Sequence, residues 1–531
     1  MAKPAVVVVD YSLYLVTEPR PALEKIVEDA LRGGATVVQL RDKDGTDEEV
    51  CATARRLLPL TRRFGVPLLI NDRVRVAVEV GADGVHVGQG DMDVREARAL
   101  MGGGKIVGVS ASSVEEAVGA CERGADYIGI GTVFATPTKK DTRTILGPEG
   151  VRKILSSLSE AGHVSTPTVC IGGVDASNAA PLLSLSRGAN NKSLDGIAVV
   201  RALVAAEDPF AAASRLRALV LAAKVADVVA SVARRVPLSH NMTNLVVQNF
   251  AANVVLAIGA SPIMSASGPE AADLASGGGG RGGGALVINT GTITPDGLAN
   301  QLEALKAYNS ARKPVVLDPV GVGATSIRRN AVNSLLSTGH FTAIKANASE
   351  MLSLHLSSSS SSSSSSPLQR GVDSTTLLTP PSLAALTRAV SLSHRCIAIT
   401  TGKSDFVSDG RRTIRVANGH DILASVTGSG CCLGAVVASA LASYDADPLL
   451  ACLGAVVVYA VAAEFAAARV EVRGPGTFVP AFLDELYAIR TATLAGDLRW
   501  LAMVRVESVD VDDEATPCAS SSSSLPPDPP C

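Results

Sequence analysis

Acidic and basic side chains follow short apolar runs in the first 200 residues. Asp72 ends the run LLIND, and Asp91 follows GVHVGQG. Two such carboxylates can hold Mg²⁺ if the fold brings them together, because Mg²⁺ prefers oxygen ligands. Arg41, Lys43 and Lys139 follow other runs, and these cations suit diphosphate oxygens, Arg as a fork and Lys as a point charge. The residues predict a site for Mg²⁺ and a diphosphate.

A second anion site is indicated by the segment IGGV, which contains Gly173. Glycine lets the main chain approach a ligand closely, so the backbone amides of this segment can bind a second phosphate. Further polar side chains lie at the ends of the same apolar runs, namely Gln39, Asn71, Ser110, Thr136 and Thr138. We therefore expect a diphosphate site beside a monophosphate site.

These residues need a scaffold that gathers the ends of many strands. The β-branched runs YLVT, TVVQL, PLLI, GVHV, KIVGVS, DYIGIG, TVCIGG and GIAVV recur between residues 14 and 200, with helix-compatible segments between most of them. Alternation of this kind is typical of a (β/α)₈ TIM barrel, whose chemistry lies at the carboxyl ends of its strands. The polar residues named above fall at those ends.

The C-terminal half carries a different phosphate signal. In VTGSGCCLGAVVASAL, Gly428 lies at the entry of a long apolar helix, where free N–H groups and the helix dipole favour an anion. A glycine turn of this kind can also be only a packing feature. Its neighbours favour chemistry, because NASE supplies the carboxylate of Glu350 with Lys345 just upstream, and TTGKSDFVSDG places Thr401 at a strand end.

Length and composition predict two large domains. The chain has 531 residues, of which 47% are hydrophobic and 19% charged, a balance that suits layered α/β packing. The runs ALVINTG, PVVLDPVG, AIKAN and CIAITTG predict an αβα layered domain after residues 209–235, which we interpret as a closing helix and connector. We expect a barrel in residues 1–225, the layered domain in 226–508 and a disordered tail in 509–531.

Other features exclude several classes of protein. A formal charge of −3 gives no general attraction to polyanions, so a nucleic-acid partner is not expected. The most apolar stretch, residues 449–463, is shorter than a membrane span and predicts a buried helix. Nine cysteines without a CxxC pair indicate reduced thiols in the cytoplasm. Glycine-rich residues 276–284 and serine-rich residues 357–366 predict flexible loops.

The N-terminal segments YLVT, QLRDK, LLINDRV, GADGVHVGQGDM, VGVSASS, ADYIGIGTVFATPTKKD and IGGV resemble thiamine-phosphate synthase in order. The resemblance implies Mg²⁺-dependent coupling of 4-amino-5-hydroxymethyl-2-methylpyrimidine diphosphate to thiazole phosphate. It implies that the pyrimidine diphosphate is bound by Gln39, Arg41, Lys43, Asn71, Ser110 and Lys139, that Mg²⁺ is held by Asp72 and Asp91, and that thiazole phosphate is bound by Thr136, Thr138, Gly173 and Val200. Two residues depart from the family, since Gly90 replaces a frequent Glu and Arg201 replaces the usual Ser.

The C-terminal segments SHNMTNLVVQNFAAN, LAIGASPIMSA, LVINTGT and VVLDPVGVGAT resemble hydroxyethylthiazole kinase of the ribokinase-like superfamily. The resemblance implies a thiazole site at Met264 and Gly428, ATP contacts from Lys345 and Thr401, and Mg²⁺ at Glu350. Cys431 stands where sugar kinases carry a catalytic Asp. A thiol at a helix N-terminus can have a lowered pKa and accept the substrate proton, although a buried packing cysteine is the alternative.

Together the halves resemble the fungal-type fusion of these two enzymes. The kinase would make thiazole phosphate from the alcohol and ATP, and the synthase would consume it. Two alternatives remain open, a chain in which only one domain is active and a non-catalytic thiamine-sensing scaffold on the same folds. We expect small-molecule substrates, a homo-oligomer, and neither a membrane nor a nucleic acid as partner.

Overall fold

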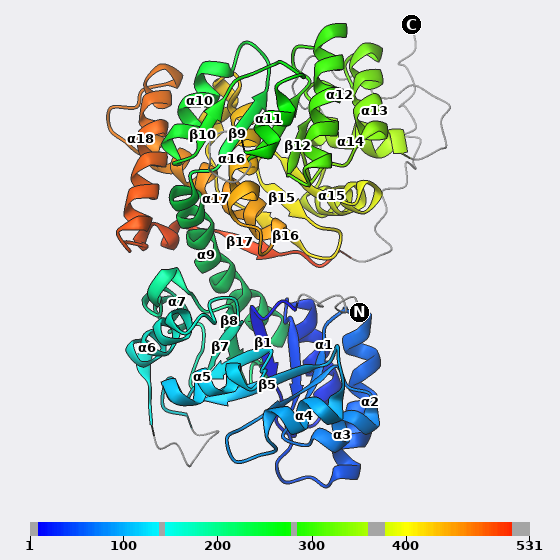
Figure 1. Ribbon diagram of the computed structural model, residues 1–531, viewed down its shortest axis with the longest axis vertical. Helices are drawn as coiled ribbons and strands as arrows, with labels where there is room; N and C mark the ends of the chain where they lie inside the picture. Colours follow the sequence, from blue (N-terminus) through cyan, green and yellow to red (C-terminus); the bar gives the residue numbers. More distant parts are fainter. Residues whose placement is uncertain (1–8, 137–143, 278–283, 359–377, 512–531) are drawn as a thin grey trace, which may run out of the picture. The chain divides into compact units, whose positions relative to one another are not determined.

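The computed structural model describes residues 9–136, 144–277, 284–358 and 378–511 (Figure 1). Contacts divide the chain into one unit of Met1–Ala230 with Thr491–Ser508, and a second of Ser231–Arg490 with Val509–Cys531. The division falls within one helix, α9 (Pro209–Arg235), whose bounds match the expected closing helix and connector. The limits of 1–225 and 226–508 remain predictions, and the tail from residue 512 lies outside the described residues.

The first unit contains a closed barrel whose strands pair in chain order from β1 to β8. All neighbouring strands are parallel, including β8 against β1. The strands are β1 (Leu13–Val16), β2 (Val37–Leu40), β3 (Leu68–Asn71), β4 (Gly84–Val87), β5 (Ile106–Ala111), β6 (Tyr127–Ile130), β7 (Thr168–Ile171) and β8 (Gly196–Val199). Each corresponds to one of the eight runs, so the predicted TIM-like barrel is confirmed.

Amphipathic helices connect the barrel strands. In α2, a capping box joins Thr46 and Glu49, and the buried face carries Val50, Ala54 and Leu57. The helices are α1 (Leu23–Arg32), α2 (Asp47–Arg63), α3 (Val74–Val80), α4 (Val94–Met101), α5 (Val114–Glu122), α6 (Gly147–Glu160), α7 (Ala179–Leu185) and α8 (Arg201–Val204), with a 3₁₀ turn η1 (Ala189–Asn191). Their apolar faces and the outward side chains of the strands form one core.

The second unit is built on a mixed sheet with the order β10-β9-β11-β12-β13-β14-β15-β16. The first six strands in this order are parallel, and β15 and β16 add an antiparallel hairpin. The strands are β9 (Leu238–Met242), β10 (Ser261–Ile263), β11 (Ala285–Asn289), β12 (Val315–Asp318), β13 (Ala343–Asn347), β14 (Ile397–Thr401), β15 (Asp405–Ser408) and β16 (Thr413–Val416); β17 (Val506–Ser508) follows near the C-terminus. The four predicted strands are β11 to β14.

Helices cover both faces of this sheet, as expected for three αβα layers. One group packs together as α10 (Gln248–Ala257), α16 (Ser429–Ser443) and α17 (Pro448–Ala467), and Figure 1 shows α18 (Pro475–Leu494) beside it. The other contains α11 (Ala271–Ser276), α12 (Pro295–Ser310), α13 (Ser326–Thr338), α14 (Ala348–Ser358) and α15 (Pro380–His394). Two 3₁₀ turns, η2 (Asp421–Ser425) and η3 (Arg499–Met503), complete the described elements.

Helix α17 contains the most apolar stretch of the sequence. It has 20 residues, so it is long and apolar enough to cross a bilayer, but 89% of its most hydrophobic window is buried inside the protein. The prediction of a buried helix is confirmed, although the helix is longer than residues 449–463. Residues 278–283 and 359–377, which hold most of the glycine-rich and serine-rich runs, lie outside the described part of the chain.

Candidate active sites

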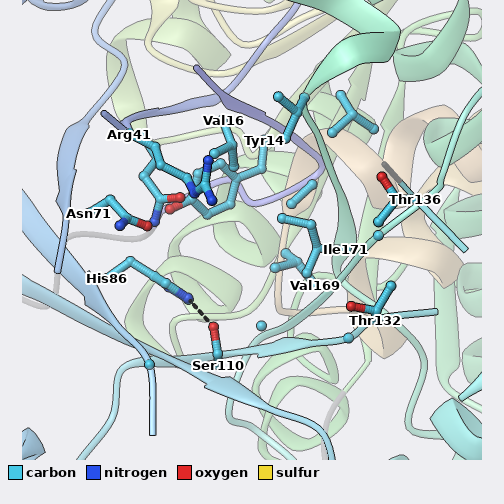
Figure 2. Close-up of a pocket in the computed structure, with 18 of the residues that line it drawn as sticks. Tyr14, Val16, Arg41, Asn71, His86, Ser110, Thr132, Thr136, Val169 and Ile171 are labelled. Atoms are coloured by element: carbon cyan, nitrogen blue, oxygen red, sulfur yellow. Dashed lines mark hydrogen bonds between the residues drawn. The ribbon is translucent and has the colours of Figure 1, made fainter. Parts of the chain in front are cut away.

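A cavity of about 790 Å³ opens at the carboxyl ends of the barrel strands. It gathers ten of the residues predicted for the synthase chemistry, and Figure 2 shows Arg41 and Asn71 on one side with Thr136 and Ile171 on the other. The predicted residues that line it are Gln39, Arg41, Lys43, Asn71, Asp72, Asp91, Ser110, Thr136, Gly173 and Val200. Thr138 and Lys139 lie outside the described residues.

The two predicted metal carboxylates, Asp72 and Asp91, line the cavity as neighbours. Burial, a hydrogen bond with Asp91 and the charge of Asp91 together raise the pKa of Asp72 to about 6, against the lowering effects of Lys43 and Asn71. Asp72 has a φ of 60°, a left-handed conformation that is uncommon outside glycine and that stores strain, often at functional sites. Asp91 accepts a hydrogen bond from the Gly88 amide at 2.7 Å. Paired carboxylates of this kind suit a divalent cation.

Positive charge lies beside these carboxylates. Lys43 Nζ is 4.0 Å from Asp72 Oδ2, and the Lys43 side chain is 59% exposed. Arg41 lines the same part of the cavity, and its backbone amide is fixed by a hydrogen bond to Thr17 Oγ1. Neither cation is buried, so both remain available to an anionic ligand.

Four side chains form a hydrogen-bonded chain at the inner end of the cavity, and three of them, Tyr14, His86 and Ser110, line it. His86 Nε2 bonds Ser110 Oγ at 2.8 Å (Figure 2), His86 Nδ1 bonds Tyr127 OH at 2.6 Å, and Tyr127 OH bonds Tyr14 OH at 2.7 Å. Burial lowers the pKa of His86 to about 4, so the ring is neutral at pH 7, with one nitrogen donating and the other accepting. Gly108 makes this possible, because a Cβ there would lie 2.1 Å from the Tyr127 ring.

Across the cavity, the loops after β6, β7 and β8 provide Thr132, Thr136, Gly173 and Val200. Gly172 and Gly173 have φ values of 103° and 65°, which other residues rarely adopt. A Cβ on Gly173 would also lie 2.8 Å from Phe134 and Ala135 atoms. Only glycine fits there, and because both glycines line the cavity their backbone can meet an anion, as IGGV predicts.

In the second unit, the parallel strands β9 to β14 end at one edge of the sheet. Met264 follows β10, Asp318 ends β12, Asn347 ends β13 and Thr401 ends β14. Helix α16 begins near this edge after Gly428, which has a φ of 78° and where a Cβ would lie 2.6 Å from Val247 Cγ2. The structure thus brings the predicted kinase residues to one edge of the sheet.

A buried polar network connects the strand ends with α16. Lys345 Nζ is 2.8 Å from Asp318 Oδ1, and their side chains are 5% and 0% exposed. Asn289 Nδ2 donates to Asp318 Oδ2 at 2.7 Å. Asn244 Nδ2 donates to Asn289 at 3.2 Å and to Cys431 Sγ at 3.5 Å. The predicted ATP-contacting lysine and the predicted catalytic cysteine therefore belong to one network.

The pKa of Cys431 departs from expectation. Burial and the charge of Asp318 raise it to about 11, although Lys345 and hydrogen bonds from Asn289 and Asn244 act in the opposite direction. The prediction of a lowered pKa is therefore wrong, because desolvation outweighs the position at the start of a helix. Cys431 is a neutral thiol at pH 7.

Glu350 has a local structural role as well as the predicted one. Asn347 N donates to Glu350 Oε2 and Glu350 N donates to Asn347 Oδ1, both at 3.0 Å, so NASE forms a reciprocal cap of α14. Gly321 N donates to the other carboxylate oxygen at 2.7 Å. Burial and the charge of Asp318 nevertheless raise the pKa of Glu350 to about 7. A buried carboxylate close to a second one fits a cation, because each oxygen keeps a lone pair.

Comparison with known proteins covers both halves. The profile described as "Thiamine monophosphate synthase" matches residues 13–203, and the profile "Hydroxyethylthiazole kinase family" matches residues 229–492. The "Probable thiamine biosynthetic bifunctional enzyme" of Schizosaccharomyces pombe is 36% identical over 94% of this chain and 99% of its own length. The chain belongs to the thiamine biosynthetic bifunctional enzymes. It fuses thiamine-phosphate synthase and hydroxyethylthiazole kinase domains, and both are transferases.

Single-domain relatives correspond to each half of this bifunctional enzyme. The "Thiamine-phosphate synthase" of Chloroflexus aurantiacus is 48% identical over 40% of this chain and 94% of its own length. The "Hydroxyethylthiazole kinase" of Actinobacillus succinogenes is 40% identical over 51% of this chain and 96% of its own length. The fusion therefore retains a complete counterpart of each enzyme.

Several residues in the two sites of the bifunctional enzyme escaped the sequence analysis. His86 and Tyr127 lie inside apolar runs, where they resemble core residues. Asp318 ends the strand of VVLDPVG, a signal equivalent to that of Asp72, and it could have been found. Asp405 accepts a hydrogen bond from Gly402 N at 2.9 Å, and burial raises its pKa to about 7; nothing in the sequence marked it.

Proposed function

We propose that the barrel couples 4-amino-5-hydroxymethyl-2-methylpyrimidine diphosphate to thiazole phosphate within the cavity at its mouth. The proposal is carried by one observation, which is that the cavity joins a cationic and acidic side to a glycine-lined side. Arg41, Lys43 and Lys139 would bind the diphosphate, and Gln39, Asn71 and Ser110 the rest of the pyrimidine substrate. Thr136, Thr138, Gly173 and Val200 would bind thiazole phosphate.

We further propose that Asp72 and Asp91 hold Mg²⁺ in this site. The fit rests on the adjacent carboxylates and the raised pKa of Asp72, since such a pair loses its mutual repulsion when a cation binds. Bound there, Mg²⁺ would neutralise charge on the departing diphosphate. Gly90 stands where the family frequently has Glu, at a position where a Cβ would meet nothing within 4 Å. Asp72 and Asp91 would therefore supply the negative charge that the protein contributes to the metal site.

The coupling step needs no general base. The C–O bond to the diphosphate breaks and its electron pair leaves with the diphosphate, so a pyrimidinylmethyl cation forms. The thiazole nitrogen then donates its lone pair to the methylene carbon. The residues act by positioning and charge stabilisation, while neutral His86 fixes the Ser110 hydroxyl.

We propose that the second domain transfers the γ-phosphoryl group of ATP to the hydroxyl of 4-methyl-5-(2-hydroxyethyl)thiazole. Met264 and Gly428 would contact the thiazole, and Lys345 and Thr401 would contact ATP. A Cβ on Gly430 would lie 3.7 Å from Lys345 Nζ, so the lysine points towards the start of α16, where amides and the helix dipole favour a phosphate. Glu350, with Asp318 nearby, would hold Mg²⁺.

Cys431 remains our proposed proton acceptor in the kinase reaction. Because its thiol is neutral at rest, only the thiolate fraction, formed when the Sγ proton passes to solvent, would accept the alcohol proton during transfer. Phosphoryl transfer requires mainly positioning and charge stabilisation, so a modest contribution from this residue suffices.

We propose a cytoplasmic homo-oligomer that needs no membrane or nucleic-acid partner. The seven described cysteines are free thiols, which suits a reducing compartment. Leu245 and Val246 are exposed by 74% and 72%, as expected for side chains that another subunit could cover.

One coupled assay tests the proposed function. The purified chain is given the thiazole alcohol, ATP, Mg²⁺ and the pyrimidine diphosphate, and thiamine phosphate is measured. Each half is then assayed alone, by ADP formation with the alcohol and by coupling of supplied thiazole phosphate. Formation of thiamine phosphate only from supplied thiazole phosphate would show that the kinase half is inactive.

A further inference from the structure

Arg201 lines the synthase cavity but has no assigned role. It follows Val200 at the start of α8, where relatives of the synthase usually have serine, and it is exposed. In the part of the chain that the structure describes, its side chain makes no hydrogen bond or ion pair. A cation that lines a cavity without a protein partner is available to a ligand.

The barrel topology separates Arg201 from the proposed metal site. The closed order runs from β1 to β8, so β8 lies across the barrel from β4, and β7 lies across from β3. Arg201 follows β8, whereas Asp72 and Asp91 follow β3 and β4. Arg41 and Lys43 follow β2, and they are the other cations among the described residues of the cavity wall. Arg201 therefore supplies the far side with its own positive charge.

The surroundings of Arg201 suit an anion. Gly172 and Gly173 expose backbone on the neighbouring loop, and the Thr132 and Thr136 side chains line the same side. Asp175 of that loop also lines the cavity, and its Oδ1 accepts hydrogen bonds from the Ser177 amide at 2.8 Å and hydroxyl at 2.5 Å, while Arg201 stays unpaired with it. This side of the cavity thus combines exposed amides, hydroxyls and a guanidinium.

We propose that the Arg201 guanidinium binds the phosphate of thiazole phosphate and so selects the phosphorylated thiazole over its alcohol. This inference rests on the proposed synthase function. Arginine pairs with phosphate through parallel N–H···O bonds, which a serine hydroxyl cannot reproduce. The residue discriminates between the substrate and the product of the kinase domain, because the two differ only in this phosphate.

Substitution of Arg201 tests the proposal through a selective change in KM. A hydrogen bond to a charged group contributes about 1.5–3 kcal/mol, so Arg201→Gln should raise KM for thiazole phosphate about 10- to 100-fold. KM for the pyrimidine diphosphate should change less than twofold. Arg201→Lys should fall between Gln and the parent, because it keeps the charge but not the fork. Calorimetric titration with thiazole phosphate should show the same order.

The matched control is Arg152→Gln, which removes an equal charge from the exposed surface of α6, where Arg152 pairs with Glu149. It should bind thiazole phosphate like the parent. The thiazole alcohol offered as acceptor should react equally poorly with the parent and Arg201→Gln, because the alcohol has no phosphate for Arg201 to bind.

Unchanged thiazole phosphate binding by Arg201→Gln would overturn the proposal while leaving the synthase function intact. An equal rise in both KM values would do so too, because it would indicate a general disturbance. Failure of the parent to form thiamine phosphate would instead overturn the proposed function, and the calorimetric comparison would still decide whether Arg201 binds the phosphate.

Discussion

The two sites of this enzyme handle charge differently. In the barrel, Lys43 is 59% exposed and lies 4.0 Å from Asp72, and the carboxylates share an open cavity. In the kinase domain, Lys345 and Asp318 are buried and in direct contact. The charged groups of the barrel site are partly exposed and can pair with ligands, whereas Lys345 and Asp318 of the kinase site are already paired with each other. Substitutions in the barrel should therefore affect activity first, and substitutions in the kinase network should also affect stability.

The largest expected effect is on the barrel's activity. Asp72→Ala should reduce coupling of supplied thiazole phosphate by about 10³-fold or more, because loss of a metal site removes several kcal/mol of transition-state stabilisation. ADP formation with the thiazole alcohol should be unchanged, because the two proposed metal sites lie in separate units. Loss of both activities in a folded variant would contradict the division of labour.

The same comparison predicts stability effects of different size for two lysines. Lys345→Met leaves Asp318 buried without its partner and should cost the kinase domain about 3–5 kcal/mol of unfolding free energy. Lys43→Met removes an exposed charge and should change stability by less than about 1 kcal/mol. Hydrogen exchange of β13 and β2 under native conditions measures each domain separately. Equal effects at both positions would remove the proposed contrast.

Cys431→Ala should lower kinase kcat about 10²-fold, the lower end of the range for a general base, because the parent thiol is protonated at neutral pH. Cys431→Asp should keep or raise kcat, since a carboxylate accepts a proton more readily. Single-turnover rates with saturating ATP and alcohol separate this effect from binding. If the Ala variant turns over like the parent, Cys431 is only a packing residue.

The smallest effect concerns the pH dependence of barrel stability. The pKa of His86 in the folded protein is about 4, below its ordinary value of 6.5. As the pH falls, His86 is therefore protonated in the unfolded chain before it is protonated in the folded one. Its contribution to stability is present above pH 6.5 and is lost as the pH falls through 4. His86→Gln should flatten that decline. Fluorescence of Trp500, which lies in the same unit, can report it during denaturant unfolding, and parallel pH profiles would argue against this contribution.

The fold could be predicted from the sequence where a strong local strand pattern recurs many times, as it does in the barrel. Eight β-branched runs with helix-compatible segments between most of them predicted the barrel, and polar residues after them indicated the cavity. The strands β9 and β10 were missed because LSHNM is polar and SPI is short and contains proline. The hairpin β15–β16 was missed because each of its strands has only four residues.

The candidate sites were predictable only in part. Asp72 and Asp91 lie far apart in sequence, but barrel topology alone brings them together. The pKa of Cys431 depends on burial and on Asp318, which is more than 100 residues away in the chain. No local sequence pattern could therefore predict the direction of its pKa shift. The His86–Tyr127 bond likewise needs Gly108 on a third strand to make room.

The opposed sides of the barrel cavity have a consequence for how the product departs. In the proposed reaction both substrates enter with an anionic group, and each group would be held on its own side. After bond formation, the diphosphate is a separate molecule, and thiamine phosphate keeps only the monophosphate. The larger product would therefore be anchored at one end alone, beside Gly173 and Arg201. Release from that anchor, rather than from the metal side, should set how long the finished vitamin precursor occupies the barrel.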